Sequence, residues 1–407
     1  MSTKLKATIL ASSLAILLFT FVGGFVNVRA SSNDGAYRQL SVYSEVLSRI
    51  RGDYVEEPNI PSVTEGALHG LLESLDANSS YLSEAEYKHY KATRPEGKAN
   101  IGAFVSKRFG YADVVAVIPG GPADKAGIEN SDILESIDGK STHDMSLAEI
   151  RTELLGETGT TVTVSVVRPR KAEPQKIVIT RDMVTIPPVE DRLMADGVGY
   201  VKVDTFTAGK AEEIAGKVRD LQKQGAKKLV LDLRNSAGGD ESEGIATANL
   251  FLDHGTITYL QGQKYPKQAF NADPAKDITK LPVAVLVNRG TAGPAEIVAA
   301  AILENARGDV VGDKTFGDGS VQKVIEMRDN AGALILSVAK YYSPGGKSIQ
   351  DVAVTPNVLV ADNSDDDSGL PDEDVAPSPT DNAKPKNAPD DQLNKALEVL
   401  KNRESKG

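Results

Sequence analysis

Short runs of consecutive apolar residues alternate with helix-like segments over residues 185–361. The run LPVAVLV at 281–287 is rich in β-branched side chains, and a similar run begins the segment 229–235. Such runs are typical of parallel strands that are buried on both faces of a sheet. Residues 294–303 follow with good helix formers, and the proline at the start suits a first helical turn. The pattern predicts an α/β domain over 185–361.

Residues 96–184 show a different pattern. Strand-like runs at 114–117 and 161–167 enclose a glycine-rich turn and a helical segment at 146–155, which predicts a separate, smaller module. Ahead of it, residues 31–95 carry apolar side chains at helical spacing. This spacing predicts either a helical cap on the main domain or a dimerisation region, and the sequence leaves both open.

The N-terminal residues 1–30 have the pattern of an export signal. Lys4 and Lys6 precede an uncharged apolar stretch, and Val28 and Ala30 are small residues at the positions that a signal peptidase reads. We therefore predict an exported protein, of the kind found in a bacterial periplasm. The apolar stretch is also about as long as a membrane-spanning helix requires, so an uncleaved anchor is the alternative.

The C-terminal part is acidic. Residues 362–391 contain ten acidic and two basic residues and so carry −8 of the chain's net charge of −11. With five prolines and few apolar residues, this segment is predicted to be a disordered linker. Residues 392–407 return to helical spacing, which predicts a short amphipathic helix that docks on this chain or on a partner. The rest of the chain has no basic stripe, so nucleic acid is not an expected partner.

Histidine and cysteine usage bears on metal and disulfide chemistry. The chain has no cysteine, which excludes a disulfide framework. Its four histidines show no ligand-like spacing: His69, His89, His143 and His254. We therefore predict no metal site, no cofactor and no Ser/His/Asp triad.

Ala295 stands at the start of the predicted helix 294–303, just beyond the carboxyl end of the strand 281–287. Backbone N–H groups at a helix N-terminus favour developing negative charge, and nucleophiles are often placed there. A methyl group cannot attack a peptide bond. Ala295 therefore occupies a place suited to a nucleophile, with a side chain that is not one.

The segments 290–296 (GTAGPAE) and 314–322 (KTFGDGSVQ) resemble the catalytic motifs of the carboxy-terminal processing peptidases, tail-specific proteases with a PDZ domain. In that family a serine stands directly before the glutamate, and a Lys-Thr-Phe-Gly-Lys-Gly-x-x-Gln run supplies a lysine base and a supporting glutamine. Here the serine position is Ala295 and the lysine position is Asp318, and only Gln322 keeps its identity. Acyl transfer needs a nucleophile and a base, so the usual Ser/Lys dyad cannot form.

The resemblance implies a multidomain protein that combines a helical cap, a PDZ domain and a ClpP/crotonase-like α/β protease core. It assigns Gly238 and Gly239, which follow the segment 229–235, to the frame of an oxyanion hole. It also assigns the segment Ile101-Gly102-Ala103-Phe104 to the PDZ loop that holds the terminal carboxylate of a peptide added as a strand. The implied partners are protein C-terminal tails or unfolded polypeptides, with a homodimer as a further expectation.

Two functions follow from these positions. The first is a pseudoprotease that binds C-terminal tails through its PDZ domain without cleaving them. The second is an active serine-type endopeptidase in which Ser320 or Thr291 replaces the missing nucleophile. The second requires a base within hydrogen-bond reach of the displaced hydroxyl.

Overall fold

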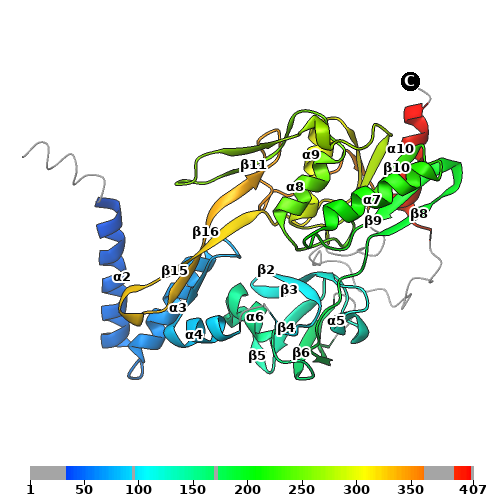
Figure 1. Ribbon diagram of the computed structural model, residues 1–407. Helices are drawn as coiled ribbons and strands as arrows, with labels where there is room; N and C mark the ends of the chain where they lie inside the picture. The colour runs from blue at the N-terminus through cyan, green and yellow to red at the C-terminus, as the bar shows by residue number, and fades with distance from the viewer. Residues whose placement is uncertain (1–33, 94–96, 169–172, 362–388, 405–407) are drawn as a thin grey trace, which may run out of the picture. The chain divides into compact units, whose positions relative to one another are not determined.

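The computed structural model describes residues 34–93, 97–168, 173–361 and 389–404 (Figure 1). The predicted signal peptide or anchor at 1–30 and most of the predicted acidic linker lie outside the described residues. Within the described ranges, no helix combines the length and the apolar character needed to cross a membrane. The domain boundaries drawn from the sequence stay predictions.

The chain divides into two compact units, residues 1–68 and 69–407, and each is described by itself. The first contains α2 (Asp34–Asp53) and most of α3 (Ile60–Glu73), as the helical spacing predicted. Large apolar side chains of α2 are exposed to solvent. They include Tyr37, Leu40, Val42 and Val46.

The centre of the second unit is a six-stranded sheet in the order β17-β14-β13-β10-β9-β8. Its strands are parallel except for β8, which pairs with β9 in the antiparallel sense. Every residue of β10 and β13 is buried, which confirms the buried parallel strands predicted from the apolar runs in these segments. The strand bounds are β8 (Glu190–Leu193), β9 (Val198–Lys202), β10 (Lys228–Asp232), β13 (Val283–Val287), β14 (Gly308–Gly312) and β17 (Val358–Leu359).

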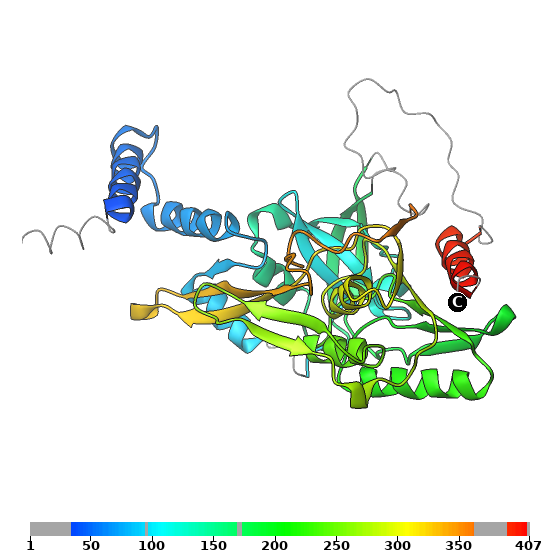
Figure 2. The same ribbon diagram turned by 90° about the horizontal axis from the view of Figure 1, so that it is seen from above.

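Helices cover both faces of this sheet: α7, α8 and α9 lie on one face and α10 lies on the other, as Figure 2 shows for α7 and α10. Successive strand residues point to opposite faces. One set of strand side chains packs with α7 (Lys210–Lys223), α8 (Glu241–Asn249) and α9 (Pro294–Glu304). The alternate set, which includes Val230 and Leu286, packs with α10 (Asp391–Glu404).

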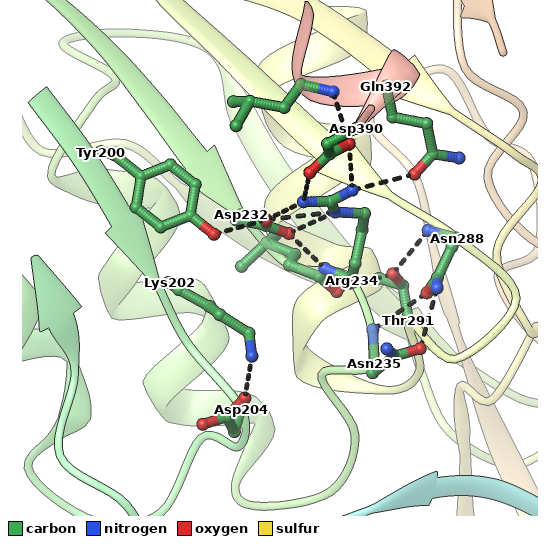
Figure 3. A network of polar contacts seen from close by, with 12 residues as sticks. Tyr200, Lys202, Asp204, Asp232, Arg234, Asn235, Asn288, Thr291, Asp390 and Gln392 are labelled. Carbon is green, nitrogen blue, oxygen red and sulfur yellow. Dashed lines mark hydrogen bonds and ion pairs between the residues drawn. The ribbon is translucent and has the colours of Figure 1, made fainter. Parts of the chain in front are cut away.

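The C-terminal helix α10 is held by polar contacts as well as by its apolar face. Asp390, just ahead of α10, forms a bidentate ion pair with Arg234 at 2.8 and 2.9 Å (Figure 3). Arg234 also binds the buried Asp232, which accepts a hydrogen bond from the Tyr200 hydroxyl at 2.8 Å. The sequence left open whether this helix docks on its own chain or on a partner. In the structure it docks on its own chain.

A second sheet carries two residues of the candidate site, Ser320 and Gln322. Its path is β1-β16-β11-β12, with β15 paired to β16. The helix α4 (Glu84–Ala92) follows β1 in the chain. The strand bounds are β1 (Ser80–Leu82), β11 (Thr256–Gln261), β12 (Gln268–Asn271), β15 (Ser320–Glu326) and β16 (Ala333–Tyr342).

The module predicted around residues 96–184 has a sheet and an apolar core of its own. The sheet runs β2-β3-β4-β6-β7, with β5 paired to β4, so β2 is an edge strand next to α6. The strands are β2 (Ala103–Arg108), β3 (Tyr111–Val117), β4 (Ile133–Ile137), β5 (Lys140–Ser141), β6 (Thr161–Val167) and β7 (Gln175–Thr180). The helices are α5 (Pro122–Lys125) and α6 (Leu147–Glu153), and four 3-10 turns occur in the described chain at Thr142–Asp144, Ala195–Gly197, Pro274–Lys276 and Arg328–Asn330.

Candidate active-site cleft

Ala295 is the second residue of α9, directly after the turn that leaves β13. Gly293 caps this helix with a φ of 66°, in the left-handed region that glycine adopts without strain. The Ala295 side chain is fully buried and belongs to the main apolar core. The position that the resemblance assigns to the nucleophile thus holds a methyl group among apolar neighbours.

The Glu296 carboxylate connects this helix to the segment that carries Asp318. It is fully buried and accepts hydrogen bonds from the Thr315 hydroxyl and from three backbone N–H groups. Those N–H groups belong to Gly317 and Asp318, both at 2.8 Å, and to Gly293 at 3.0 Å. Burial raises the pKa of Glu296 to about 8, while the donors favour its charged form. One carboxylate therefore fixes the start of α9 to the segment that leads into β15.

Asp318, at the position of the family's lysine, faces charged and polar groups from other elements. Burial raises the pKa of its carboxyl, whereas the positive charge of Arg151 and a hydrogen bond from Asn78 favour the charged form. Arg151 lies on α6, the helix beside the edge strand β2. A carboxylate at 318 attracts this cation, whereas a lysine would repel it. The electrostatic effect of Asp318 is therefore opposite to that of a dyad lysine.

Gln322 and Ser320 lie together on β15. The Gln322 side-chain amide donates to Ser320 Oγ at 2.8 Å, and the Asn78 side-chain amide donates to the same oxygen at 3.1 Å. Among the described residues, no lysine or histidine is bonded to Ser320. The hydroxyl therefore accepts two hydrogen bonds and has no base to take its proton.

Thr291, the other hydroxyl near the start of α9, has two backbone partners. Its Oγ1 donates to the Leu233 carbonyl at 2.7 Å and accepts from the Asn288 N–H at 3.0 Å. Figure 3 shows how the Asn288 and Asn235 side chains join the two loops around it. Thr291 therefore connects two turns of the core and presents no free hydroxyl.

Gly238 and Gly239 form the loop that the resemblance assigns to the oxyanion frame. Both have positive φ, 72° and 102°, and no described acceptor is bonded to their N–H groups. The Phe104 ring packs so closely that a Cβ on Gly238 would lie 1.8 Å from its Cε1. Only glycine fits here, and a residue of the candidate peptide loop covers the candidate oxyanion frame.

The candidate peptide loop lies at the start of β2. Ile101 is buried in the module's core, and Gly102 has a φ of 72°. The Gly102 N–H donates to the Asn100 side chain at 2.7 Å, so this amide is already engaged. Ala103 and Phe104 begin the edge strand along which an added peptide strand would pair.

The sequence did not single out three residues that the structure places around the cleft. Glu296 offered one usable signal, because a glutamate three residues after a helix cap is typical of a capping box. Arg151 and Asn78 offered none, since their contacts with the cleft join segments far apart in the chain. The assigned positions Ala295, Asp318, Gln322, Gly238 and Gly239 stay predictions as functional sites.

Comparison with known proteins gives two family matches. Residues 197–360 match peptidase family S41, and residues 114–168 match a PDZ domain. A carboxy-terminal-processing protease of Bartonella bacilliformis is 32% identical over 339 residues, covering 82% of this chain and 78% of the relative. The carboxy-terminal processing protease CtpA of Bacillus subtilis is 30% identical over 356 residues, covering 87% and 75%. A solved photosystem II D1 C-terminal processing protease has a TM-score of 0.65 and 26% identity, over 79% of this chain and 92% of that one.

Proposed function

Because this chain belongs to the carboxy-terminal processing proteases of peptidase family S41 and contains a PDZ domain, we propose that it binds protein C-terminal tails without cleaving them. The observation that carries the proposal is the buried methyl group of Ala295 at the helix start where the family places its nucleophile. Asp318 in the lysine position supports it, because its charge is opposite to that of the base. Peptide binding needs neither residue, since the edge strand β2 lies in a different sheet.

The alternative, an endopeptidase with a displaced nucleophile, has less support. Ser320 accepts two amide hydrogen bonds, and Thr291 donates to a backbone carbonyl. Either hydroxyl would have to leave these partners and find a neutral base before it could attack. Covalent labelling of the unmodified chain by a serine-reactive probe would favour this alternative.

The direct test compares the unmodified chain with the double variant Ala295→Ser/Asp318→Lys on an unfolded protein substrate. We expect no cleavage by the unmodified chain and slow cleavage by the double variant, at least about 100-fold above background, because oxyanion donors and substrate positioning act on a restored dyad. Burial and the charge of Arg151 would both lower the pKa of a lysine at 318, as a neutral base requires. Product formation is measured by mass spectrometry.

Each single variant is the matched control, and we expect both to stay near background because nucleophile and base act as a unit. Cleavage by the unmodified chain that disappears in Ser320→Ala or Thr291→Ala would contradict the proposal. An inactive double variant that still folds would show that the cleft differs from the family's in more than these two residues.

We further propose that the protein is exported and works as a homodimer. The export proposal rests on the pattern of residues 1–30. N-terminal sequencing of the protein isolated from whole cells distinguishes a cleaved signal from a retained anchor. The dimer proposal is supported by the exposed apolar side chains of α2, Tyr37, Leu40 and Val46 among them, which a second copy would cover. Sedimentation analysis of Leu40→Glu tests it.

A further inference from the structure

The free edge of β2 is already occupied at one point by a side chain of α6. Arg151 donates to the Val105 carbonyl from Nε at 3.3 Å and from Nη2 at 3.1 Å. Val105 lies in β2, whose other edge pairs with β3. The acceptor that Arg151 uses is therefore on the edge where a peptide strand would be added.

A peptide that pairs along β2 must compete with Arg151 for this carbonyl. Strand addition depends on main-chain hydrogen bonds, so the guanidinium has to move aside or share the acceptor. The displaced guanidinium can then bind another acceptor. A carboxylate is the acceptor that suits an Arg side chain best, because it accepts two parallel hydrogen bonds. The bound tail is the nearest new source of such a group.

The protein itself leaves the Arg151 charge available. No described carboxylate forms a close ion pair with Arg151. The residue has exposed surface, although the protein around its guanidinium lowers the pKa of this group. Asp318 attracts it only at longer range. Lys107, further along β2, is already bound to Glu73 and to the Met145 carbonyl, both at 2.6 Å. Among the described residues, Arg151 is therefore a cation beside the groove that has a carbonyl and no carboxylate as its close partner.

The register of an added strand places a particular peptide residue near Arg151. If the terminal carboxylate sits on the loop 101–104, the last residue lies opposite Ala103 and the third residue from the end lies opposite Val105, because the strands run antiparallel. Directly opposite side chains share one face of a sheet. Val105 packs in the core cluster with Ile150 of α6, so the opposite peptide side chain also faces α6.

We propose that the PDZ groove selects C-terminal tails with an acidic residue at the third position from the end, which Arg151 binds as it leaves the Val105 carbonyl. This inference rests on the proposed tail-binding function and names the class of tail. It makes Arg151 a specificity-determining residue of the groove. When no tail is bound, the guanidinium donates to the Val105 carbonyl, and the charge of Asp318 attracts it only at longer range.

Fluorescence anisotropy with the full chain tests this directly. The probes are labelled eight-residue peptides with an apolar last residue and a free C-terminus, differing only in Glu, Gln or Lys at the third position from the end. We expect the Glu peptide to bind at least about tenfold more tightly than the Lys peptide, with Gln between them. Amidated versions of the same peptides show how much binding depends on the terminal carboxylate.

Two variants separate charge recognition from a structural role. Arg151→Glu should reverse the order of the Glu and Lys peptides, and Arg151→Met should remove the charge preference while the Gln peptide binds equally well or better. Lys125→Glu is the matched control, because it replaces a cation by an anion at an exposed position of α5, outside β2 and α6. It should leave the order of the peptides unchanged.

The outcomes distinguish the two levels of the proposal. Equal affinity for the Glu, Gln and Lys peptides in the unmodified chain would overturn the inference about Arg151 and leave tail binding intact. Absence of binding by all peptides, to both the unmodified chain and Arg151→Met, would overturn the tail-binding function itself and the inference with it.

Discussion

Glu296→Ala is expected to lower the free energy of unfolding by about 3–5 kcal/mol, because it leaves four buried donors without their acceptor. These donors hold the first turn of α9 to the segment that carries Asp318. The loss should appear in urea unfolding monitored by circular dichroism. Glu212→Ala, at an exposed position on α7, is the control and should change stability by less than about 0.5 kcal/mol.

The pH dependence of stability gives a second measurement of the same group. The pKa of Glu296 is about 8 in the folded chain and near its ordinary value of 4.5 in the unfolded chain. The unfolded chain therefore loses this proton first, so the contribution to stability is complete below pH 4.5 and declines as the pH rises through 8. Glu296→Gln should lack this decline. An identical pH dependence of stability for Glu296→Gln and the unmodified chain would contradict the raised pKa of Glu296.

Leu400→Asp is expected to detach α10 from the core sheet and to lower the free energy of unfolding by about 3–5 kcal/mol. Leu400 and Ala396 are fully buried against strand residues that include Val230 and Leu286. An aspartate at 400 would place an unpaired carboxylate on this apolar surface. Urea unfolding measures the loss, and limited proteolysis should cut the variant near the C-terminus faster.

The matched control for this variant is Asn394→Asp, which adds the same charge at an exposed position of the same helix. It should leave both measurements nearly unchanged. Equal unfolding midpoints for the two variants would show that α10 contributes nothing to the stability of the core. The ion pair between Arg234 and Asp390 would then be only a surface contact.

The elements of the core could be predicted because local sequence dictates them. The apolar runs at 229–231 and 281–287 predict strands buried on both faces, and the structure has them as β10 and β13. The helical spacing at 392–401 was equally clear. The surface that α10 covers could not be predicted. The sequence pattern does not show which face of the core sheet the other helices leave uncovered.

The polar contacts of the cleft could not be predicted in the same way. Glu296 has one local signal, its place three residues after the helix cap, but the other three donors come from the segment 315–318. The contact between Arg151 and the Val105 carbonyl joins a helix to a strand across 46 positions. No periodicity encodes such a pairing, because it depends on how β2 and α6 pack in three dimensions.

The place of α10 in the chain affects the order in which the protein can fold during synthesis. The strands that α10 covers are all made before residue 361, yet one side of their sheet stays bare until residues 389–404 have left the ribosome. The nascent chain must therefore include α10 before this side of the core is covered. Under the export proposal, late closure of this kind would keep the chain loose enough to pass through a translocation channel.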